Sequence, residues 1–185
     1  MKNVSNAYKK VIEQGGPFYL RAKVTLADST ILELTPERDF QIDGNGIVQD
    51  GGSGFPLGVA ASKTLTIALD NSDDRYSKYD FVNARITPKT EAYTEDGTEW
   101  IQEEIFTVLD PVEIGDTIEL TAYDDMYKAD RAFASKLDYP ATVKQLLLEV
   151  CDACDIPVGS PTFKNETYQV QTKPEGKTAR QIIGY

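Results

Sequence analysis

Between Phe18 and Tyr123 the sequence consists of short β-rich runs separated by turn residues, and this pattern restricts the fold more than any other feature. The clearest run, Ser62 to Asp70, places Leu65, Ile67 and Leu69 on one side and small or polar residues on the other. Alternation with a period of two residues is typical of a strand with one buried face. We count about seven or eight such runs, which predicts an antiparallel β-barrel or β-sandwich rather than a parallel sheet covered by helices.

The same alternation, and the turn residues between the runs, place the other strands of this predicted barrel. They are expected at Phe18 to Ala27 and Thr30 to Leu34, a hairpin around Asp28 and Ser29, at Val82 to Thr87, in one or two strands between Trp100 and Leu109, and at Thr117 to Ala122. Two segments are predicted to be irregular. Asp43 to Gly54 is rich in glycine and reads as a flexible loop or a tight hairpin tip. Pro88 to Gly97 is polar enough to form an exposed loop that reaches away from the sheet.

Helical patterns flank the predicted β domain and divide the chain into three parts. Residues 1–17 contain a short amphipathic helix, Ser5 to Gln14, with apolar residues at three- and four-residue spacing. Residues 18–135 form the β-barrel domain. Residues 136–185 begin a second, α+β domain, so the fold class is mainly β with a small helix-plus-strand segment at the C-terminal side.

The second domain is predicted from one strong helix and two weaker elements. Thr142 can cap a helix whose apolar stripe continues to Cys154, and a strand follows at Thr167 to Thr172. Another helical pattern starts at Thr178 and is cut short after two turns. We therefore expect that the natural protein continues beyond Tyr185 and that this second domain is truncated.

Charge and composition exclude several classes of function. The chain has 19 basic and 30 acidic residues, a net charge of −11, which repels nucleic-acid phosphates and anionic membrane surfaces. It has no apolar run long enough to span a bilayer, and its first residues lack the apolar core of a secretory signal, so we expect synthesis in the cytoplasm and no membrane insertion. It also has no histidine, which excludes Ser-His-Asp and Cys-His catalysis within this chain.

The remaining candidates for chemistry favour structural roles. Cys151 and Cys154 form a C-x-x-C pair, but both lie on the apolar stripe of the predicted helix and near its acidic C-terminal end, so core packing is the expected role. Glu103 and Glu104 are adjacent on a strand and therefore point to opposite faces, which does not suit glycoside hydrolysis. We expect no catalytic residue, no metal and no cofactor.

An acidic turn and three aromatic rings follow the clearest strand. Asp70 ends that strand, and the polar residues after it favour a chain reversal because their side chains bond to nearby backbone. Tyr76, Tyr79 and Phe81 then lie within six residues, which predicts a loop held against the sheet by buried rings. Asp80 adds to the carboxylates, but arginine and phenylalanine stand where an EF-hand calcium loop needs glycine and glutamate. We expect the acidic residues to cap turns and to form solvated edges.

Four motifs occur in a characteristic order along the chain. They are L-x-I-x-L-D-N-x-D-x-x-Y-S-x-Y-D-F-x-x-A-x-I from Leu65 to Ile86, E-I-F-T-V from Glu104 to Val108, I-E-L-T-A-Y-D-D-M from Ile118 to Met126, and Tyr139 to Thr142 before the leucine-rich helix. Together they resemble the N-terminal domain of phage and prophage tail proteins of the baseplate hub class, over residues 55–154. The sequence departs from that family where glutamate replaces the usual glycine before the aromatic strand.

The resemblance implies a structural protein rather than an enzyme. Such hub proteins form rings, usually trimers, in which barrel domains lie side by side around a lumen and contact other tail and baseplate proteins. By that resemblance the protein is a virion tail component, and its surface acts through strand pairing. The structural and interface candidates are Leu65, Ile67, Leu69, Asp70, Tyr76, Tyr79, Asp80 and Phe81.

Two other functions stay open. The first is a tail-associated cell-wall hydrolase, whose catalytic part lies either in this segment or in a further C-terminal region. The second is a β module that binds carbohydrate or calcium. Its contact surfaces would be the aromatic loop of Tyr76, Tyr79 and Phe81 and the polar loop from Pro88 to Gly97.

Overall fold

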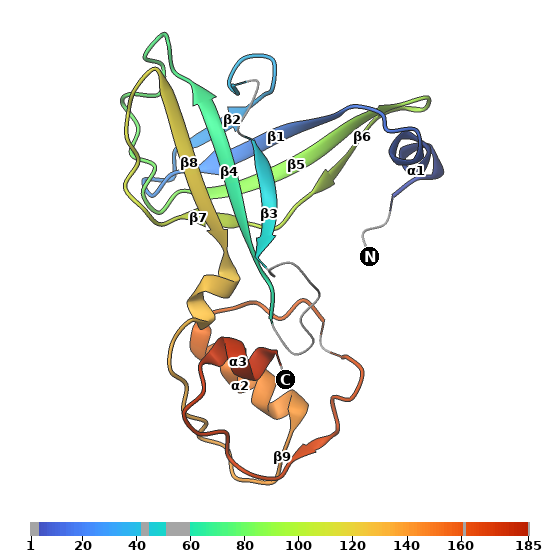
Figure 1. The fold of residues 1–185 in the computed structure, drawn as a ribbon, viewed down its shortest axis with the longest axis vertical. Coiled ribbons are helices and arrows are strands. Elements are labelled where there is room, and N and C mark those ends of the chain that lie inside the picture. The colour runs from blue at the N-terminus through green and yellow to red at the C-terminus, as the bar shows by residue number, and fades with distance from the viewer. Residues whose placement is uncertain (1–3, 42–44, 51–59, 161, 185) are drawn as a thin grey trace. The chain divides into compact units, whose positions relative to one another are not determined.

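The computed structural model describes residues 4–41, 45–50, 60–160 and 162–184 (Figure 1). Residue contacts divide the chain into two compact units. The first contains Met1–Val48 and Thr64–Asp124, and the second contains Gln49–Lys63 and Asp125–Tyr185. The predicted boundary between residues 135 and 136 therefore falls inside the second unit, whereas the N-terminal helix belongs to the first.

The main sheet has eight strands, all of whose described pairings are antiparallel, and it curls into a half-barrel (Figure 1). The strands are β1 Phe18–Thr25, β2 Ile31–Leu34, β3 Gly46–Asp50, β4 Ser62–Asp70, β5 Arg85–Thr94, β6 Gly97–Gln102, β7 Phe106–Val108 and β8 Thr117–Asp124. Their order is β2-β1-β5-β7-β8-β4-β3, and β6 pairs with β5 beside β7. The predicted antiparallel β fold is thus confirmed, and the predicted hairpin corresponds to β1 and β2.

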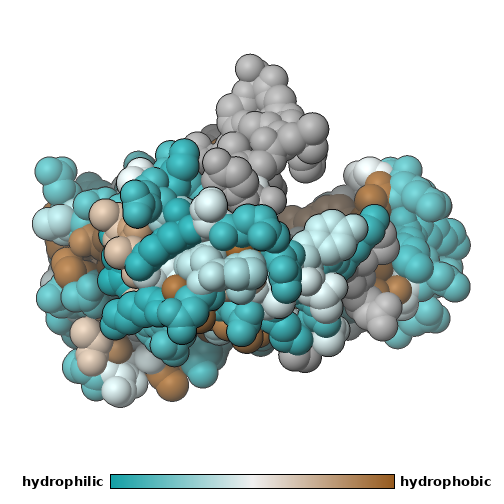
Figure 2. All heavy atoms as spheres, turned by 90° about the horizontal axis from the view of Figure 1, so that it is seen from below, coloured by the Kyte–Doolittle hydropathy of each residue, from teal (hydrophilic) through white to brown (hydrophobic). Residues whose placement is uncertain are grey.

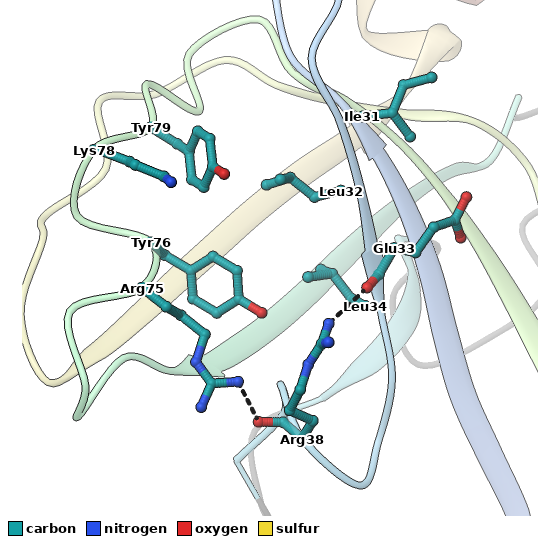
Figure 3. Close-up of a pocket in the computed structure, with 9 residues that line it drawn as sticks. All are labelled: Ile31, Leu32, Glu33, Leu34, Arg38, Arg75, Tyr76, Lys78 and Tyr79. Carbon is teal, nitrogen blue, oxygen red and sulfur yellow. Dashed lines mark hydrogen bonds between the residues drawn. The ribbon is translucent and has the colours of Figure 1, made fainter.

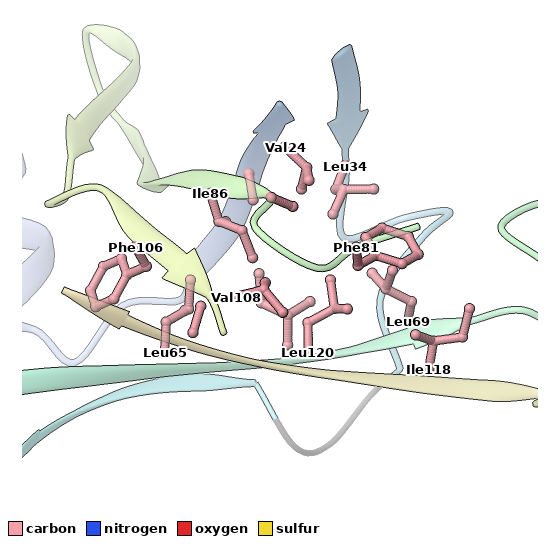
Figure 4. Packing of buried hydrophobic residues seen from close by; sticks show 14 of the residues in the cluster. Val24, Leu34, Leu65, Leu69, Phe81, Ile86, Phe106, Val108, Ile118 and Leu120 are labelled. Atoms are coloured by element: carbon pink, nitrogen blue, oxygen red, sulfur yellow. The ribbon is translucent and has the colours of Figure 1, made fainter. Parts of the chain in front are cut away.

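The core of the first unit lies inside the curl of the sheet (Figure 4). Leu65, Ile67 and Leu69 of β4 are fully buried, as the alternation predicts. Across the strand pair, Ile118 lies opposite Leu69 and Leu120 opposite Ile67, and both are also fully buried. Each such side chain contributes about 1.5 to 3 kcal/mol by leaving water, so this strand pair is a main source of the stability of the unit.

The glycine-rich segment Asp43 to Gly54 is only partly irregular. Gly46–Asp50 forms β3, so the prediction of a loop is wrong for these residues. The sequence gives little sign of this strand because its apolar residues are limited to Ile47 and Val48. The rest of the predicted loop, apart from Asn45, lies outside the described residues.

The prediction of an exposed loop from Pro88 to Gly97 is wrong. β5 continues to Thr94 and β6 begins at Gly97, so the segment is a long hairpin. Proline normally breaks a central strand because it has no amide donor. Here the Pro88 carbonyl accepts the amide of Glu103 at 2.9 Å. The carbonyl and the missing amide donor of Pro88 lie on the same side of β5, so the missing donor faces the short segment between the end of β6 at Gln102 and the start of β7 at Phe106. One ladder bond is lost, and the strand continues.

Helix α1, Asn6–Glu13, packs at the far end of this hairpin (Figure 1). Ser5 caps the helix by accepting the amide of Tyr8 at 3.0 Å, and the carboxylate of Glu99 on β6 accepts the Ser5 amide at 2.9 Å. The Tyr8 ring is buried and lies 5.7 Å from the ring of Phe18. The helix is thus attached to the hairpin through its cap and one aromatic ring.

The second unit consists of short elements around a smaller core. They are η1 Asp125–Ala129, β9 Ala141–Thr142, α2 Val143–Cys154, β10 Gln169–Val170 and α3 Ala179–Ile183. Thr142 and Thr178 form capping boxes at the starts of α2 and α3, which confirms both predicted helix starts. The predicted strand Thr167 to Thr172 is shorter than expected, and among the described residues it pairs with β9 alone. No helix in the described part of the chain is long and apolar enough to cross a lipid bilayer.

The surface is mainly polar where it can be seen. Figure 2 shows a face on which most residues are hydrophilic and the hydrophobic ones form small separate groups. Larger groups of exposed rings or cations therefore merit attention as candidate contact surfaces.

Candidate interaction surface

The acidic residues after β4 serve the local turns. The Asp70 carboxylate accepts the amide of Ser72 at 3.0 Å, and the Asp80 carboxylate accepts the amide of Val82 at 2.9 Å. The Asp73 carboxylate pairs with Arg75, with Nε at 2.7 Å. These bonds are the side-chain-to-backbone contacts typical of Asx turns, supplemented by an exposed ion pair. In the described residues, no group of three or more histidine, cysteine, aspartate or glutamate side chains is arranged to hold a metal ion.

The three aromatic rings of the corner, Tyr76 to Phe81, face mainly inward. Tyr76 is 5% exposed and Phe81 is 1% exposed, and both belong to the core of the sheet. Tyr79 is half-buried and contacts Phe81 edge-on, with ring centroids 6.5 Å apart. The predicted bracing of the corner by buried rings is confirmed for Tyr76 and Phe81, and only a small part of Tyr76 and none of Phe81 lines the neighbouring groove.

Asp39 joins this corner to the segment that follows β2. Its carboxylate is fully buried and accepts hydrogen bonds from the Tyr76 hydroxyl at 2.5 Å, the Thr35 amide at 2.7 Å and Arg38 Nε at 2.6 Å. Arg75 adds a longer contact at 3.3 Å. A buried carboxylate is stable only when it is surrounded by donors in this way. The segment is also paired to β4, because Gln41 donates its amide to the Ala68 carbonyl at 2.8 Å.

These contacts change the acid–base properties of the two buried partners. Burial alone would raise the pKa of Asp39, but the hydrogen bonds from Arg38, Tyr76 and the Thr35 amide lower that pKa below its ordinary value. Burial and the hydrogen bond to Asp39 raise the pKa of Tyr76 to about 12. Asp39 therefore stays ionised and Tyr76 stays protonated near neutral pH.

A groove of about 450 Å³ runs between β2 and the aromatic corner (Figure 3). One wall is the whole of β2, and the other carries Tyr76 and Tyr79. Three cationic side chains also line it, although the chain has a net charge of −11. They are Arg38, Arg75 and Lys78, and Lys78 Nζ lies 5.0 Å from the centre of the Tyr79 ring. Glu33 also lines the groove, and Arg38 and Arg75 are paired with Asp39 and Asp73, so these charges largely balance.

The open edge of β2 borders this groove. In the described part of the chain, β2 pairs with β1 only and is the end strand of the sheet. Leu26 donates its amide to the Thr30 carbonyl at 2.9 Å, so the backbone of Thr30 faces β1. In an antiparallel pair, alternate residues face the partner strand, so the backbone N–H and C=O groups of Ile31 and Glu33 point away from β1. Arg38 occupies one of these groups, because its guanidinium donates to the Glu33 carbonyl at 3.2 Å. An edge of this kind can accept a further strand.

The hairpin of β5 and β6 presents a second group of aromatic residues. Tyr93 and Trp100 are each 53% exposed. Tyr19 of β1 contacts Tyr93 edge-on with centroids 5.3 Å apart, and Lys89 Nζ lies 4.5 Å from the centre of the Trp100 ring. The register places Tyr19 and Trp100 on either side of Glu91, so these rings share one face of the hairpin. This aromatic face lies in the segment that was predicted to be a polar loop.

The cysteine pair lies in the core of the second unit. Cys151 and Cys154 are both buried and are not joined by a disulfide. Burial, with a smaller effect from Cys154, raises the pKa of Cys151, which opposes formation of a reactive thiolate. The side chains therefore act as small apolar groups on α2, in agreement with the expected core packing.

The structure separates the predicted candidates into two sets. Leu65, Ile67 and Leu69 lie inside the core and cannot contact a partner, whereas Tyr76 and Tyr79 line the groove. Whether any of these residues takes part in an interface stays a prediction. The residues that sequence reasoning missed are the groove cations, Asp39 and the edge residues Ile31 and Glu33. Nothing in the sequence distinguishes Asp39 from the other acidic residues.

Comparison of the sequence with models of known protein families finds no match, and comparison with curated proteins finds no match either. The candidate site therefore rests on its own geometry. It combines an open strand edge, a groove beside that edge lined by charged and aromatic side chains, and a separate exposed aromatic face. An open strand edge of this kind can bind an extended segment by strand addition.

Proposed function

We propose that the protein is a structural component of a phage or prophage tail, of the baseplate hub class, which acts by ring assembly and strand pairing. The observation that carries this proposal is the edge of β2, which is open in the described part of the chain, because an unpaired strand edge is a natural site for pairing with another chain. The four motifs that resemble hub proteins support the same function. The partners would be further copies of this chain, in a trimer by that resemblance, and other tail proteins.

The proposal is tested by measuring the assembly state of the purified protein. Size-exclusion chromatography with light scattering over a range of concentrations, followed by negative-stain electron microscopy, should show closed rings of a few copies. Tail genes beside the gene for this chain would give independent support. A protein that stays monomeric at high concentration, encoded away from tail genes, would contradict the proposal.

The aromatic face of the hairpin favours a second candidate, binding of carbohydrate. Tyr93 and Trp100 expose half of their surface, and flat exposed rings are suitable for stacking on sugars. Trp100 is the single tryptophan of the chain, so selectively excited tryptophan fluorescence reports on this face alone. Titration with cell-wall oligosaccharides should shift the emission if sugars bind there. An unchanged spectrum at saturating sugar would exclude this role.

A further inference from the structure

We propose that the aromatic face of the hairpin binds an uncharged, β-1,4-linked glycan that lies across β1, β5 and β6. This inference rests on the second candidate function, carbohydrate binding, and names the class of glycan and its direction on the sheet. Tyr19 and Trp100 each stack on one sugar ring. The ion pair of Arg21 and Glu91 bonds to the hydroxyl groups of the sugar between them.

The register of the sheet places two rings of this face in one row across the strands. Tyr19 of β1 and Trp100 of β6 both lie opposite Glu91 of β5. Their backbones are therefore separated by two strand spacings, about 10 Å. In an extended β-1,4-linked chain every second sugar turns the same face to a surface, and the disaccharide repeat is close to this distance. A glycan that crosses the strands can thus place one sugar on each ring and the intervening sugar over Glu91.

The centre of this row is polar and held in place. Arg21 Nε donates to the Glu91 carboxylate at 2.6 Å, and Arg21 Nη2 donates to the Glu37 carboxylate at 3.2 Å. The Glu91 side chain is largely buried, and that of Arg21 is about one-third exposed. Sugar hydroxyls both donate and accept hydrogen bonds, so a fixed carboxylate beside a guanidinium can bond to them. A few placed polar groups among aromatic rings are typical of ligand sites.

The charges near the rings favour an uncharged ligand. Arg21 is paired with Glu91 and Glu37, and the ammonium group of Lys89 lies over the Trp100 ring. These two cations and two carboxylates balance, so the face offers no surplus of positive charge to an acidic glycan. The net charge of −11 on the whole chain repels such a glycan as well. A neutral glycan meets neither obstacle.

The opposite face of the hairpin is covered by α1. Phe18, Ala92 and Glu99 form the neighbouring row, so their side chains point to the other side of the sheet. On that side the ring of Tyr8 lies 5.7 Å from the ring of Phe18, and Ser5 donates its amide to the Glu99 carboxylate at 2.9 Å. The aromatic face is therefore mounted on a hairpin that is supported from behind. A site formed before binding loses less entropy when the ligand arrives.

The length of the glycan tests the row of rings in the parent protein. Isothermal titration calorimetry gives the affinities, and tryptophan fluorescence shows that the ligand lies on the face of Trp100. The probes are cellohexaose and chitohexaose, which share the β-1,4 linkage and differ in the acetamido group at C2. We expect at least one of them to bind about tenfold more tightly than its own disaccharide, because a disaccharide cannot reach both rings. Whichever hexasaccharide binds identifies the preferred group at C2.

Two further glycans and one variant test the linkage, the charge and the direction. Maltohexaose is α-linked and curved, and hexamannuronate is β-1,4-linked but charged, so both should bind about tenfold more weakly than the preferred hexasaccharide. Tyr19→Ala should lower the affinity for that hexasaccharide about tenfold, to the level of the disaccharide, and leave the disaccharide affinity unchanged. Tyr168→Ala, the same truncation at an exposed tyrosine of the second unit, is the matched control and should bind like the parent. Circular dichroism checks that each variant is folded.

The other outcomes separate this inference from the functions proposed above. Equal affinities for disaccharides and hexasaccharides, or an unchanged affinity in a folded Tyr19→Ala, would overturn the placement across the strands and leave carbohydrate binding intact. Maltohexaose or hexamannuronate binding as tightly as the preferred hexasaccharide would overturn the class of glycan. No binding of any of these glycans would overturn both the inference and carbohydrate binding. Light scattering measures ring assembly separately, so failure of that function is distinguishable from failure of this one.

Discussion

The aromatic corner after β4 and the hairpin of β5 and β6 both contain several rings, but they use them in opposite ways. In the corner, Tyr76 is 5% exposed and Phe81 is 1% exposed, whereas Tyr93 and Trp100 on the hairpin are each 53% exposed. The corner belongs to the interior of the curled sheet, so its rings pack on side chains from several strands. The hairpin rings share a face that no other described strand covers. Aromatic content alone therefore does not locate a contact surface, because the curvature of the sheet decides which rings are buried.

The difference in burial between the corner rings and the hairpin rings predicts the largest difference in stability when one ring of each group is truncated. Phe81→Ala should lower the free energy of unfolding by about 4 kcal/mol, since it removes a fully buried ring and leaves a cavity. Tyr93→Ala, the matched truncation on the hairpin, should lower it by less than about 1 kcal/mol. Urea unfolding followed by circular dichroism measures both. Similar losses for the two variants would show that the hairpin ring is as important to the fold as the corner ring.

The carboxylate of Asp39 holds the corner in place, and its removal should have the next largest effect. Asp39→Asn should cost about 3 kcal/mol, because Arg38 and Arg75 lose a buried anionic partner. The pKa of Asp39 is lowered in the folded state, so its contribution is present above about pH 4 and is lost as the pH falls through the folded pKa. The free energies of unfolding of the parent and the variant should therefore converge as the pH is lowered from 7 to 2. Asp73→Asn, an exposed acid in the same corner, is the control.

The sequence predicts much of this fold because alternation and capping are local signals. The strand Ser62 to Asp70, the hairpin of β1 and β2, and the start of α2 at Thr142 all follow from residues close together in the chain. Pro88 shows where local rules fail. Its position within β5 is possible only because the missing donor faces the junction of β6 and β7, which no local pattern reveals.

The candidate surface was less predictable than the fold. The corner rings were identified from their spacing, but the groove needs β2 and the corner to meet although about 40 residues separate them. Asp39 acquires its role from Tyr76, which is distant in sequence. Lys78 lines a groove only because β2 lies opposite it. Exposure of Trp100 likewise depends on the hairpin continuing beyond the curl. Such properties come from tertiary contacts rather than from composition.

The hydroxyl of Tyr76 should make a moderate contribution that depends on pH. Tyr76→Phe leaves the buried ring and removes the bond to Asp39, so stability at pH 7 should fall by about 2 kcal/mol. Because the folded pKa of Tyr76 is raised to about 12, the contribution of the hydroxyl is present below about pH 10 and lost between pH 10 and 12. The difference between parent and variant should shrink over that range. A stability difference that stays constant between pH 10 and 12 would show that ionisation of the Tyr76 hydroxyl is not linked to unfolding.

The contacts that attach α1 to the hairpin should contribute less to the stability of the protein than the Tyr76 hydroxyl does. Ser5→Ala removes the cap of the helix and one of two bonds to the Glu99 carboxylate, which should cost about 1 kcal/mol. Ser5→Thr keeps a capping hydroxyl and should retain most of the stability. Hydrogen exchange of the Tyr8 amide measures the effect directly, since that amide is bonded to the cap. Unchanged protection in Ser5→Ala would mean that packing of Tyr8, rather than the cap, holds the helix.

The smallest effect on stability is expected for Trp100, the one aromatic residue of β6. Trp100→Ala should change the free energy of unfolding by less than about 0.5 kcal/mol, because the side chain is half exposed and its chief described contact is with Lys89. The same change should weaken assembly, since an exposed tryptophan at an open strand edge is a typical interface anchor. Light scattering measures assembly, and circular dichroism measures stability. A variant that unfolds like the parent but no longer associates would show that Trp100 acts in assembly and not in the stability of the fold. A destabilised variant would instead show that Trp100, like the corner rings, supports the fold.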